Sequence, residues 1–246
     1  MTDSLARFAD MPTTRSESIP VHEGEMPAHL AVPDSGTGPG ILLIQEIGGV
    51  NRYIREVADR LAALGYVTLA PSVFFRVQPD FAIETFTEAS LGESMRIAGQ
   101  YDAEQGLADL GAALEHLREL PEVIGGVGVV GFCFGGTQAF LMAAEYEPDA
   151  VVAYYGSGIA GSVDRAAEVQ CPLLLHFGGE DPYLPMADIE KISAATGSMS
   201  NIEILVQPDA GHAFDNHASE MFHQPDAAAA AWSRTVAFLA EHVPGE

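Results

Sequence analysis

The sequence predicts an α/β fold, in which a mostly parallel sheet carries helices on both faces. Short apolar runs alternate along the chain with longer segments in which apolar residues recur every three or four positions. The runs are continuous, as expected for strands that are covered on both faces. Strand and helix in repeated succession indicate parallel neighbours, because each helix returns the chain to the start of the next strand.

Six of the apolar runs are expected to be buried strands, since each has the length and composition of a strand. They cover residues 40–46, 66–72, 127–132, 150–156, 172–178 and 202–208. Residues 1–40 contain several prolines and glycines, and we expect one or two edge strands there, around residues 29–33.

Helical spacing is found between these runs. Three sets of apolar residues lie three or four positions apart: Ile54, Val57, Leu61 and Leu64; Leu107, Leu110, Leu114 and Leu117; and Trp232, Val236, Leu239 and Val243. We expect the first helix to stop at Gly65, the last to start near Pro225, and a further helix to start at about Gly135. No linker or internal repeat divides the chain, so we expect a single domain over residues 1–246.

The chain is strongly acidic, with 35 Asp and Glu, 11 Lys and Arg, and a net charge of −24. This charge repels phosphate backbones and anionic lipids, so neither nucleic acid nor a membrane is an expected partner. The first ten residues, MTDSLARFAD, lack the apolar stretch of a signal peptide, and two cysteines do not make a disulfide framework. We therefore expect a cytoplasmic protein.

Cys133 lies between two glycines after an apolar run, in the stretch GFCFG at residues 131–135. Strand, sharp turn and helix form the nucleophile elbow, usually written G-x-S-x-G. A Cβ at either glycine would crowd the neighbouring strand or helix. Sulfur replaces oxygen as the attacking atom, and the N-terminus of the following helix favours the thiolate. A buried structural cysteine is the alternative, but it would not need both glycines.

A base and an acid for this nucleophile follow two later strands. Asp181 lies in the loop after the run at 172–178, and His212 lies in the loop after the run at 202–208. The carboxyl ends of parallel strands meet at one edge of a sheet, where ligands bind. Nucleophile, acid and histidine in this order are typical of α/β-hydrolases. The sequence therefore predicts an α/β-hydrolase fold with the triad Cys133, Asp181 and His212.

Other residues of the same types fit these roles less well. Glu180 stays open as the acid, although the turn before Pro182 favours Asp181. The others are expected to face solvent (His217 and His223), to pack in the core (His176), to be structural (Cys171) or to belong to a loop without full elbow spacing (Ser157).

Attack on a carbonyl creates an oxyanion, which backbone N–H groups stabilise. Phe134 follows the nucleophile and should supply one N–H, and Ile47, in the loop after the first predicted parallel strand, should supply the other. Glu46 ends that strand and directs a carboxylate to the same region. The sequence has no nucleotide-binding glycine motif and no metal-ligand spacing of cysteines, so no cofactor and no metal are expected.

Taken together, these motifs resemble the dienelactone hydrolase family of α/β-hydrolases. The resemblance rests on QEIGG, GFCFGG, GGEDPYLP and GHAF, with YDAEQGLADL, AYYGSGI and the closing helix, and it extends from about residue 20 onward. It implies a cofactor-independent thiol hydrolase that opens enol lactones or cleaves activated carboxylic esters through an acyl-enzyme. It also implies that Glu46 holds the proton of the resting Cys133 until substrate displaces it.

One departure from the family concerns substrate binding. Members of the family bind a substrate carboxylate with arginines, but Asn216 occupies one such position, and Arg96 is only near the other. Without those cations, charge-assisted contacts of about 1.5–3 kcal/mol each are lost. We expect a neutral or different ester, or a carboxylate held by other arginines, such as Arg52, Arg76 or Arg96. The residues expected to contact substrate are Arg96, Phe214 and Asn216.

Two other interpretations stay open. The chain could be a non-catalytic small-molecule binding protein on a hydrolase fold. Cys133 could instead be a redox-sensing thiol, although Cys171 is expected at the far end of a strand and offers no resolving partner. For the enzyme, the expected partner is a small-molecule lactone or ester, and the expected state is a monomer or small homo-oligomer.

Overall fold

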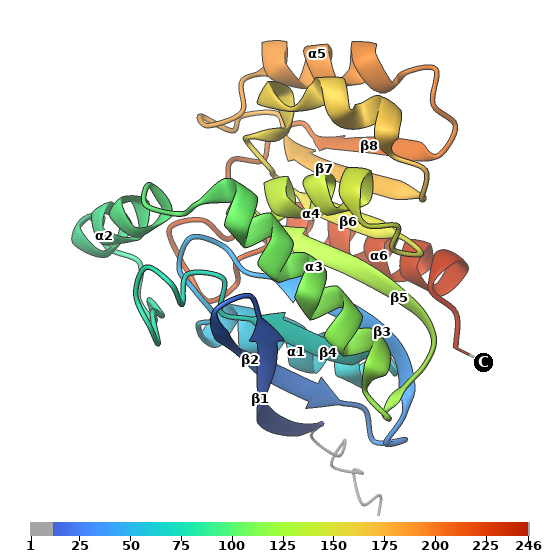
Figure 1. Ribbon diagram of the computed structural model, residues 1–246. Coiled ribbons are helices and arrows are strands. Elements are labelled where there is room, and N and C mark those ends of the chain that lie inside the picture. Colours follow the sequence, from blue (N-terminus) through green and yellow to red (C-terminus); the bar gives the residue numbers. More distant parts are fainter. Residues whose placement is uncertain (1–11, 246) are drawn as a thin grey trace, which may run out of the picture.

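The computed structural model describes residues 12–245, which contain an eight-stranded sheet (Figure 1). Its strands lie in the order β1-β2-β4-β3-β5-β6-β7-β8. β1 pairs with β2 and β2 with β4 in antiparallel fashion, and all other neighbours are parallel. The strands are β1 (Thr13–Val21), β2 (Gly24–Val32), β3 (Gly38–Ile44), β4 (Val67–Pro71), β5 (Val123–Phe132), β6 (Val151–Tyr154), β7 (Leu173–Gly178) and β8 (Ile202–Gln207).

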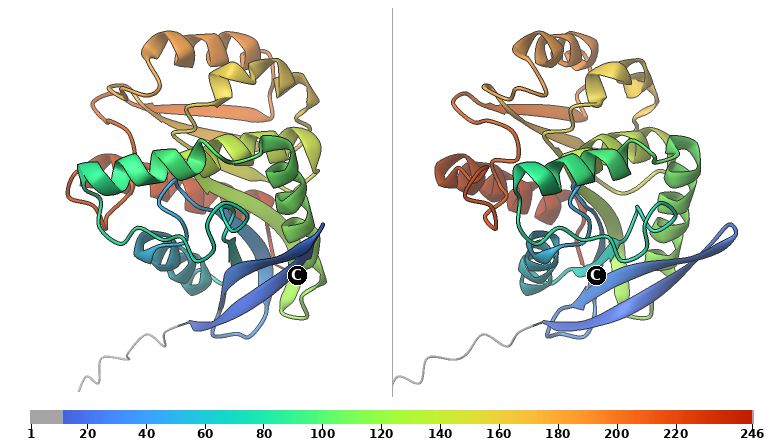
Figure 2. Two further views of the ribbon diagram at one scale, coloured as in Figure 1. Left: turned by 60° about the vertical axis from the view of Figure 1, so that its left-hand side comes forward. Right: turned by 90° about the vertical axis from the view of Figure 1, so that its left-hand side faces the viewer.

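Helices cover both faces of this sheet (Figures 1 and 2). One face packs against α1 (Arg52–Ala63) and α6 (Pro225–His242). The other face packs against α3 (Ala103–Glu119), α4 (Phe134–Glu145) and α5 (Met186–Thr196). α2 (Glu88–Ala98) lies at the edge where the parallel strands end. Two short 3-10 helices, Ile159–Gly161 and Val163–Glu168, follow β6.

The central strands are apolar throughout because each face meets a separate core. In β3, Ile41 and Leu43 pack on the side of α1 and α6, whereas Leu42 and Ile44 pack on the side of α3 and α4. All four side chains are fully buried. Continuous apolar runs therefore form strands here without the alternation that a sheet with one wet face would require.

Local signals set the limits of the helices as well. The side chain of Asn51 accepts a hydrogen bond from the N–H of Ile54 and caps the start of α1. This helix ends at Ala63, and Gly65 follows with a φ of 99°, a conformation that glycine adopts without strain. Pro225 begins α6, where its missing N–H costs no hydrogen bond.

The predicted fold class is confirmed, and the differences concern peripheral elements. β8 was expected to be buried, but its residues are only partly buried because it is the last strand of the sheet. Helical spacing did not reveal α2 or α5, whose buried faces are narrow: Ser94 and Ile97 in α2, and Ile189, Ile192 and Thr196 in α5. The prediction of an edge strand around residues 29–33 is wrong in position: these residues belong mostly to β2, which pairs with β1 on one side and β4 on the other, and the edge strand is β1.

Two sequence predictions concern residues that the structure does not describe. The absence of a signal peptide was inferred from residues 1–10, which lie outside the described residues. The single domain over residues 1–246 also includes this segment and stays a prediction. Within residues 12–245, no helix combines the length and the apolar character needed to cross a membrane.

Candidate active site

Cys133 lies in the turn between β5 and α4, in a conformation that few residues other than glycine adopt. Its φ is 54° and its ψ is −113°, and such strain costs on the order of 1–3 kcal/mol. Two hydrogen bonds fix the turn: the Cys133 N–H donates to the Tyr154 carbonyl at 3.0 Å, and the Gly135 N–H donates to the Gln45 carbonyl at 3.1 Å. Neighbouring strands thus hold the strained turn on both sides.

The glycines around Cys133 have no room for a side chain, as the sequence predicted. A Cβ on Gly131 would lie 2.0 Å from the carbonyl oxygen of Gly135, within the turn itself. A Cβ on Gly135 would lie 2.2 Å from the carbonyl oxygen of Ile44 in β3. The same holds for Gly136, where the obstacle is the Tyr154 carbonyl oxygen at 2.3 Å. The motif therefore reflects the close approach of α4 to β3 and β6.

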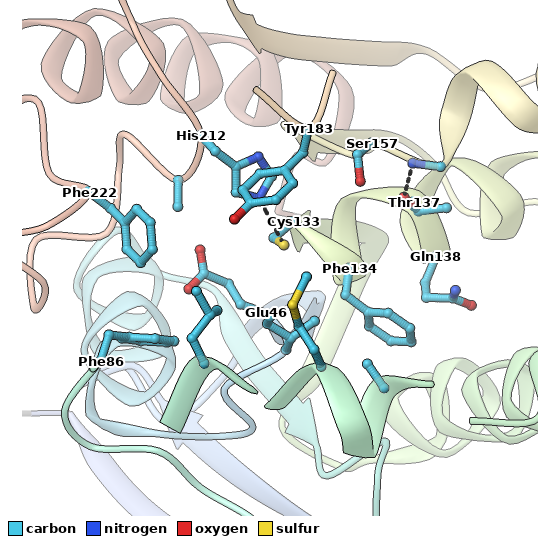
Figure 3. A pocket seen from close by; sticks show the side chains of 16 residues that line it. Glu46, Phe86, Cys133, Phe134, Thr137, Gln138, Ser157, Tyr183, His212 and Phe222 are labelled. Atoms are coloured by element: carbon cyan, nitrogen blue, oxygen red, sulfur yellow. Dashed lines mark hydrogen bonds between the residues drawn. The ribbon is translucent and has the colours of Figure 1, made fainter. Parts of the chain in front are cut away.

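The structure brings Cys133, His212 and Asp181 together from three different loops. The Sγ of Cys133 lies 3.0 Å from Nε2 of His212 (Figure 3). The Nδ1 of His212 lies 2.7 Å from Oδ2 of Asp181, whose Oδ1 accepts a hydrogen bond of 2.8 Å from the Tyr183 N–H. Asp181 is buried, whereas Glu180, the alternative acid, is exposed.

The surroundings of His212 favour its charged form. Burial by itself would lower the pKa of this imidazole, but the sulfur of Cys133 and the carboxylate of Asp181 outweigh burial and raise the pKa to about 10. The ring also packs against Tyr183 and Tyr155, with centroid distances of 4.9 Å and 5.3 Å. This arrangement places a basic imidazole beside the sulfur, as the activation of a cysteine nucleophile requires.

Two backbone donors are available near the sulfur. Phe134 is the first residue of α4, so its N–H has no partner within the helix. Within residues 12–245, neither this N–H nor that of Ile47 donates to a protein acceptor. Both residues line the same cavity as Cys133. Such donors, together with the positive end of a helix, can stabilise a developing oxyanion.

The Glu46 carboxylate is buried at the same cavity, but its contacts differ from those that the family resemblance implied. Its Oε2 accepts a hydrogen bond of 2.8 Å from the Asn216 side-chain amide, and its Oε1 accepts one of 3.4 Å from the Tyr155 hydroxyl. No hydrogen bond joins Glu46 to Cys133 among the described residues. Burial raises the pKa of Glu46 to about 7, although His212 and Asn216 act in the opposite direction. The implied proton holding by Glu46 therefore has no matching contact in this structure and stays a prediction.

A cavity of about 390 Å³ opens at this edge of the sheet (Figure 3). Most of its lining is apolar, and neither arginine nor lysine takes part in it. The lining residues are Glu46, Ile47, Phe86, Leu91, Met95, Ala98, Cys133, Phe134, Thr137, Gln138, Ser157, Gly158, Tyr183, His212, Ala213 and Phe222. Glu46 and the Cys133–His212 pair are the ionisable groups that face a ligand in this space, apart from the phenol of Tyr183.

The three residues expected to contact substrate lie outside this lining. Arg96 projects from α2 and makes two hydrogen bonds, of 2.8 Å and 2.7 Å, to Glu93. Phe214 is fully buried beside Tyr155, and Asn216 is fully buried with its amide on Glu46. Motif position could not show this, because side-chain direction in the loop between β8 and α6, and the partner of Arg96 on α2, depend on packing.

The other arginines considered for a substrate carboxylate are also engaged elsewhere. Arg52 pairs with Glu56, and Arg76 makes a two-pronged contact with the buried Asp109. Neither guanidinium lines the cavity. The cavity therefore offers no cationic side chain from any of the arginines named in the sequence analysis.

Sequence reasoning missed most of the cavity wall. Tyr183 follows Asp181 closely in GGEDPYLP, which was a usable signal, since a residue two positions after a catalytic acid is close to it in space. Phe86, Phe222 and the α2 residues Leu91 and Met95 had no such signal. They come from loops and from a weakly amphipathic helix, so no periodic pattern marks them. Of the less favoured candidates, Ser157 lines the cavity, whereas His176 is buried against Thr235.

The described part of the chain contains neither a cluster of metal-binding side chains nor a disulfide bond. Residues 12–245 contain no group of three His, Cys, Asp or Glu side chains placed to hold a metal ion. Cys133 and Cys171 are both free thiols. Burial raises the pKa of the Cys171 thiol to about 11, so this second cysteine stays protonated at neutral pH.

Comparison with known proteins agrees with this geometry. A carboxymethylenebutenolidase of Pseudomonas putida is 33% identical over 92% of this chain and 96% of its own length. A putative carboxymethylenebutenolidase of Synechocystis is 36% identical, with 88% and 92% covered. The crystal structure of a putative dienelactone hydrolase from Klebsiella pneumoniae is 29% identical and superposes with a TM-score of 0.79 over 93% of this chain and 98% of that one. The sequence model of the dienelactone hydrolase family matches residues 26–243. With a nucleophile elbow, a hydrogen-bonded triad and this match over most of its length, the chain belongs to the dienelactone hydrolase family.

Proposed function

We propose that this chain is a cofactor-independent hydrolase that opens lactones or cleaves activated carboxylic esters, with Cys133 as its nucleophile. One observation carries the proposal: the sulfur of Cys133 lies 3.0 Å from His212 at the floor of an apolar cavity, and Asp181 holds the far side of the imidazole at 2.7 Å. The carboxymethylenebutenolidases to which the chain is similar support the lactone and ester class.

The first half of the reaction forms an acyl-enzyme. The Cys133 thiolate attacks the carbonyl carbon, and the N–H groups of Phe134 and Ile47 stabilise the oxyanion. Collapse of this intermediate breaks the ester C–O bond, and the His212 imidazolium gives its proton to the departing oxygen. In a lactone the alcohol stays attached to the acyl group, because both belong to one ring.

The second half releases the product. His212 is now neutral, and it removes a proton from a water molecule that attacks the thioester carbonyl. The C–S bond breaks, the thiolate returns, and the proton remains on His212, which restores the ion pair. Asp181 keeps the imidazole in the tautomer and orientation that both halves require.

The preferred substrate in this proposal is uncharged. A carboxylate in the cavity would meet no arginine or lysine there, but it would meet Glu46 and a net charge of −24 on the protein. The apolar wall around Phe86, Phe222 and Met95 instead suits a hydrocarbon group. We therefore expect a neutral lactone or an ester with an apolar acyl or alcohol part.

The finer features of partners and location are part of the same proposal. The acidic charge of the chain supports an enzyme that binds neither nucleic acid nor membranes. The cytoplasmic location is proposed from the polar first ten residues and from cysteines that form no disulfide framework. We also propose that it acts as a single domain, either as a monomer or as a small homo-oligomer. A non-catalytic binding protein is the alternative, but each triad residue has its hydrogen-bond partner, so we do not favour it.

The test of the nucleophile uses the two cysteines as a matched pair. Cys133→Ala should lower kcat/KM for an aryl ester by at least about a thousandfold, because only the oxyanion donors and binding remain. Cys171→Ala should leave it unchanged. Iodoacetamide should inactivate the wild type and Cys171→Ala with one alkyl group on Cys133, seen by mass spectrometry. Full turnover by Cys133→Ala would disprove the proposal, and tight ligand retention without product would support the binding protein.

The substrate class is tested with a panel of matched lactones and esters. Each neutral compound is compared with an analogue of the same shape that bears a carboxylate, and alkylated enzyme serves as the control. We expect kcat/KM to favour the neutral member by about tenfold or more, since an unpaired anion in an apolar site costs 1.4 kcal/mol or more. Preference for the carboxylate member would show that cations outside the described cavity reach the substrate.

A further inference from the structure

Behind the cavity, a buried chain of four side chains connects Glu46 to a second carboxylate. The Tyr155 hydroxyl lies 3.4 Å from Oε1 of Glu46 and also 3.4 Å from the Tyr53 hydroxyl. The Tyr53 hydroxyl donates to Oδ2 of Asp215 at 2.8 Å. All four side chains are at most 3% exposed. The catalytic steps proposed above use none of these four side chains, although Glu46 lines the same cavity as Cys133.

The three contacts among these four side chains need one proton more than the two phenols supply. Three contacts join the four groups, but the two phenols carry only one proton each, and ionised carboxylates carry none. With both acids ionised, Tyr53 donates to Asp215, and Tyr155 can donate to Glu46 or to Tyr53 but not to both. One contact then brings two oxygens together without a hydrogen. The two long contacts are those on either side of Tyr155, as this shortage predicts.

One added proton satisfies every contact. If Glu46 is protonated, it donates to Tyr155, Tyr155 donates to Tyr53, and Tyr53 donates to Asp215. If Asp215 carries the proton instead, the three bonds run in the opposite direction. The two arrangements differ only in where the protons sit along the chain, and each phenol retains one proton in both.

Burial of the two acids favours a bound proton, and the nearby Asp215 adds to this at Glu46, although the cations around both acids act in the opposite direction. The groups that face Glu46 are His212 and Asp215 from the loop before α6, and Tyr155 after β6; Asn216 contacts it as a neutral donor. The groups that face Asp215 are Arg60 and Tyr53 from α1, Tyr154 at the end of β6, Tyr155 directly after it, and His217 and His223 from its own loop. Arg60, the permanent cation among them, lies 3.6 Å from Asp215 and stacks on Trp232. Burial raises the pKa of both carboxyl groups.

We propose that Glu46 and Asp215 share one proton through Tyr155 and Tyr53, and that these three residues behind Glu46 are positioning residues that set its charge. In the transfer, Glu46 loses its proton to Tyr155, the proton of Tyr155 passes to Tyr53, and that of Tyr53 passes to Asp215. The sum is protonated Glu46 plus ionised Asp215 giving ionised Glu46 plus protonated Asp215. Glu46 can therefore change its charge beside His212 without exchanging a proton through the cavity.

The influence on catalysis rests on the proposed function, whereas the shared proton does not. For this reason the first readout is spectroscopic. The C=O stretch of protonated Glu46 is identified in infrared difference spectra against Glu46→Gln and is titrated with pH. Asp215→Asn removes the second acid and keeps its shape, so the midpoint of the Glu46 band should fall by about one pH unit.

A double-mutant cycle distinguishes coupling through the two tyrosine hydroxyls from simple repulsion between the charges of Glu46 and Asp215. Tyr53→Phe and Tyr155→Phe each remove one hydroxyl and keep the ring. In either background, Asp215→Asn should shift the Glu46 midpoint by less than half as much as in the wild type. An equal shift in all backgrounds, or no shift in the wild type, would overturn the proposal. Thermal unfolding of each variant checks that the fold is retained, and the two phenylalanine variants test separate contacts.

Ester hydrolysis provides the second readout. If the proposed function holds, the acidic limb of kcat/KM against pH should move with the Glu46 midpoint in Asp215→Asn. If the infrared shift is present but Cys133→Ala retains its activity, the shared proton stands and the proposed function fails. If the infrared shift is absent and Cys133 is essential, the function stands and the shared proton fails.

Discussion

Two buried carboxylates lie near His212, and they have different surroundings. Asp181, in the loop after β7, receives the imidazole on one oxygen and the N–H of Tyr183 on the other. Glu46, in the loop after β3, receives only neutral donors, and Asp215 lies nearby as a like charge. The two carboxylates are therefore similarly buried but differ in their hydrogen-bond donors.

The comparison separates a carboxylate that contacts the imidazole directly from one that does not. Asp181 lies against Nδ1 of His212 and accepts the Tyr183 N–H, a geometry that suits a group that orients the imidazole. Burial raises the pKa of Glu46 to about 7, so this carboxyl group can gain or lose its proton near neutral pH.

Among the changes that test this comparison, Asp181→Asn is expected to have the largest effect on kcat/KM. The variant retains the shape but loses the charge that stabilises the imidazolium, and it permits the wrong tautomer of His212. We expect kcat/KM to fall by about 10²–10⁴-fold, measured with a neutral aryl ester. Glu180→Gln is the matched control, because this neighbouring acid is exposed and should have an effect below about twofold. Similar losses in both variants would assign the orienting role to the wrong residue.

The next prediction concerns stability. Glu46→Gln is expected to raise the free energy of unfolding at high pH. Burial raises the pKa of Glu46 from 4.5 to about 7, so the folded protein holds a proton that the unfolded chain releases in this interval. Stability must therefore fall as the pH rises from about 4.5 to about 7. Above pH 7 the buried ionised carboxylate costs on the order of 3 kcal/mol.

Denaturant unfolding at pH 4 and pH 8 measures this effect. Glutamine keeps an acceptor for the amide of Asn216 and has no charge to desolvate. Relative to the wild type, Glu46→Gln should therefore be equally stable at pH 4 and more stable at pH 8. If the variant were less stable at pH 8, the ionised carboxylate would contribute favourable contacts that outweigh its burial.

The side of the site that contains the triad could be predicted from the sequence. Cys133 is marked by glycines that sterics require, and Asp181 and His212 follow the strands β7 and β8, whose sequences are mainly apolar. Topology then brings the ends of parallel strands to one edge. These relations depend on backbone geometry, which short patterns of residue types encode well.

The surroundings of Glu46 could not be predicted in the same way. Tyr53 lies on α1, Tyr155 follows β6, and Asp215 lies three residues after His212. Nothing in the local pattern indicates that these side chains turn toward one another beneath the cavity. Asn216 and Phe214 were expected to contact substrate for the same reason: their place beside His212 is known from the sequence, but the direction of their side chains is not.

The smallest effect is expected from Arg96→Gln, which tests whether a cation on α2 takes part in the site. Arg96 is about half exposed and binds Glu93 one turn away on the same helix, so its charge is already paired outside the cavity. Exposed pairs of this kind contribute little to stability, because water screens them. We expect KM for a carboxylate-bearing lactone to change by less than about twofold, and stability by no more than this pair contributes. A large rise in KM confined to carboxylate-bearing substrates would show that α2 moves when substrate binds. Arg96 would then have to be counted with Glu46 and Asp181 among the charges of the site.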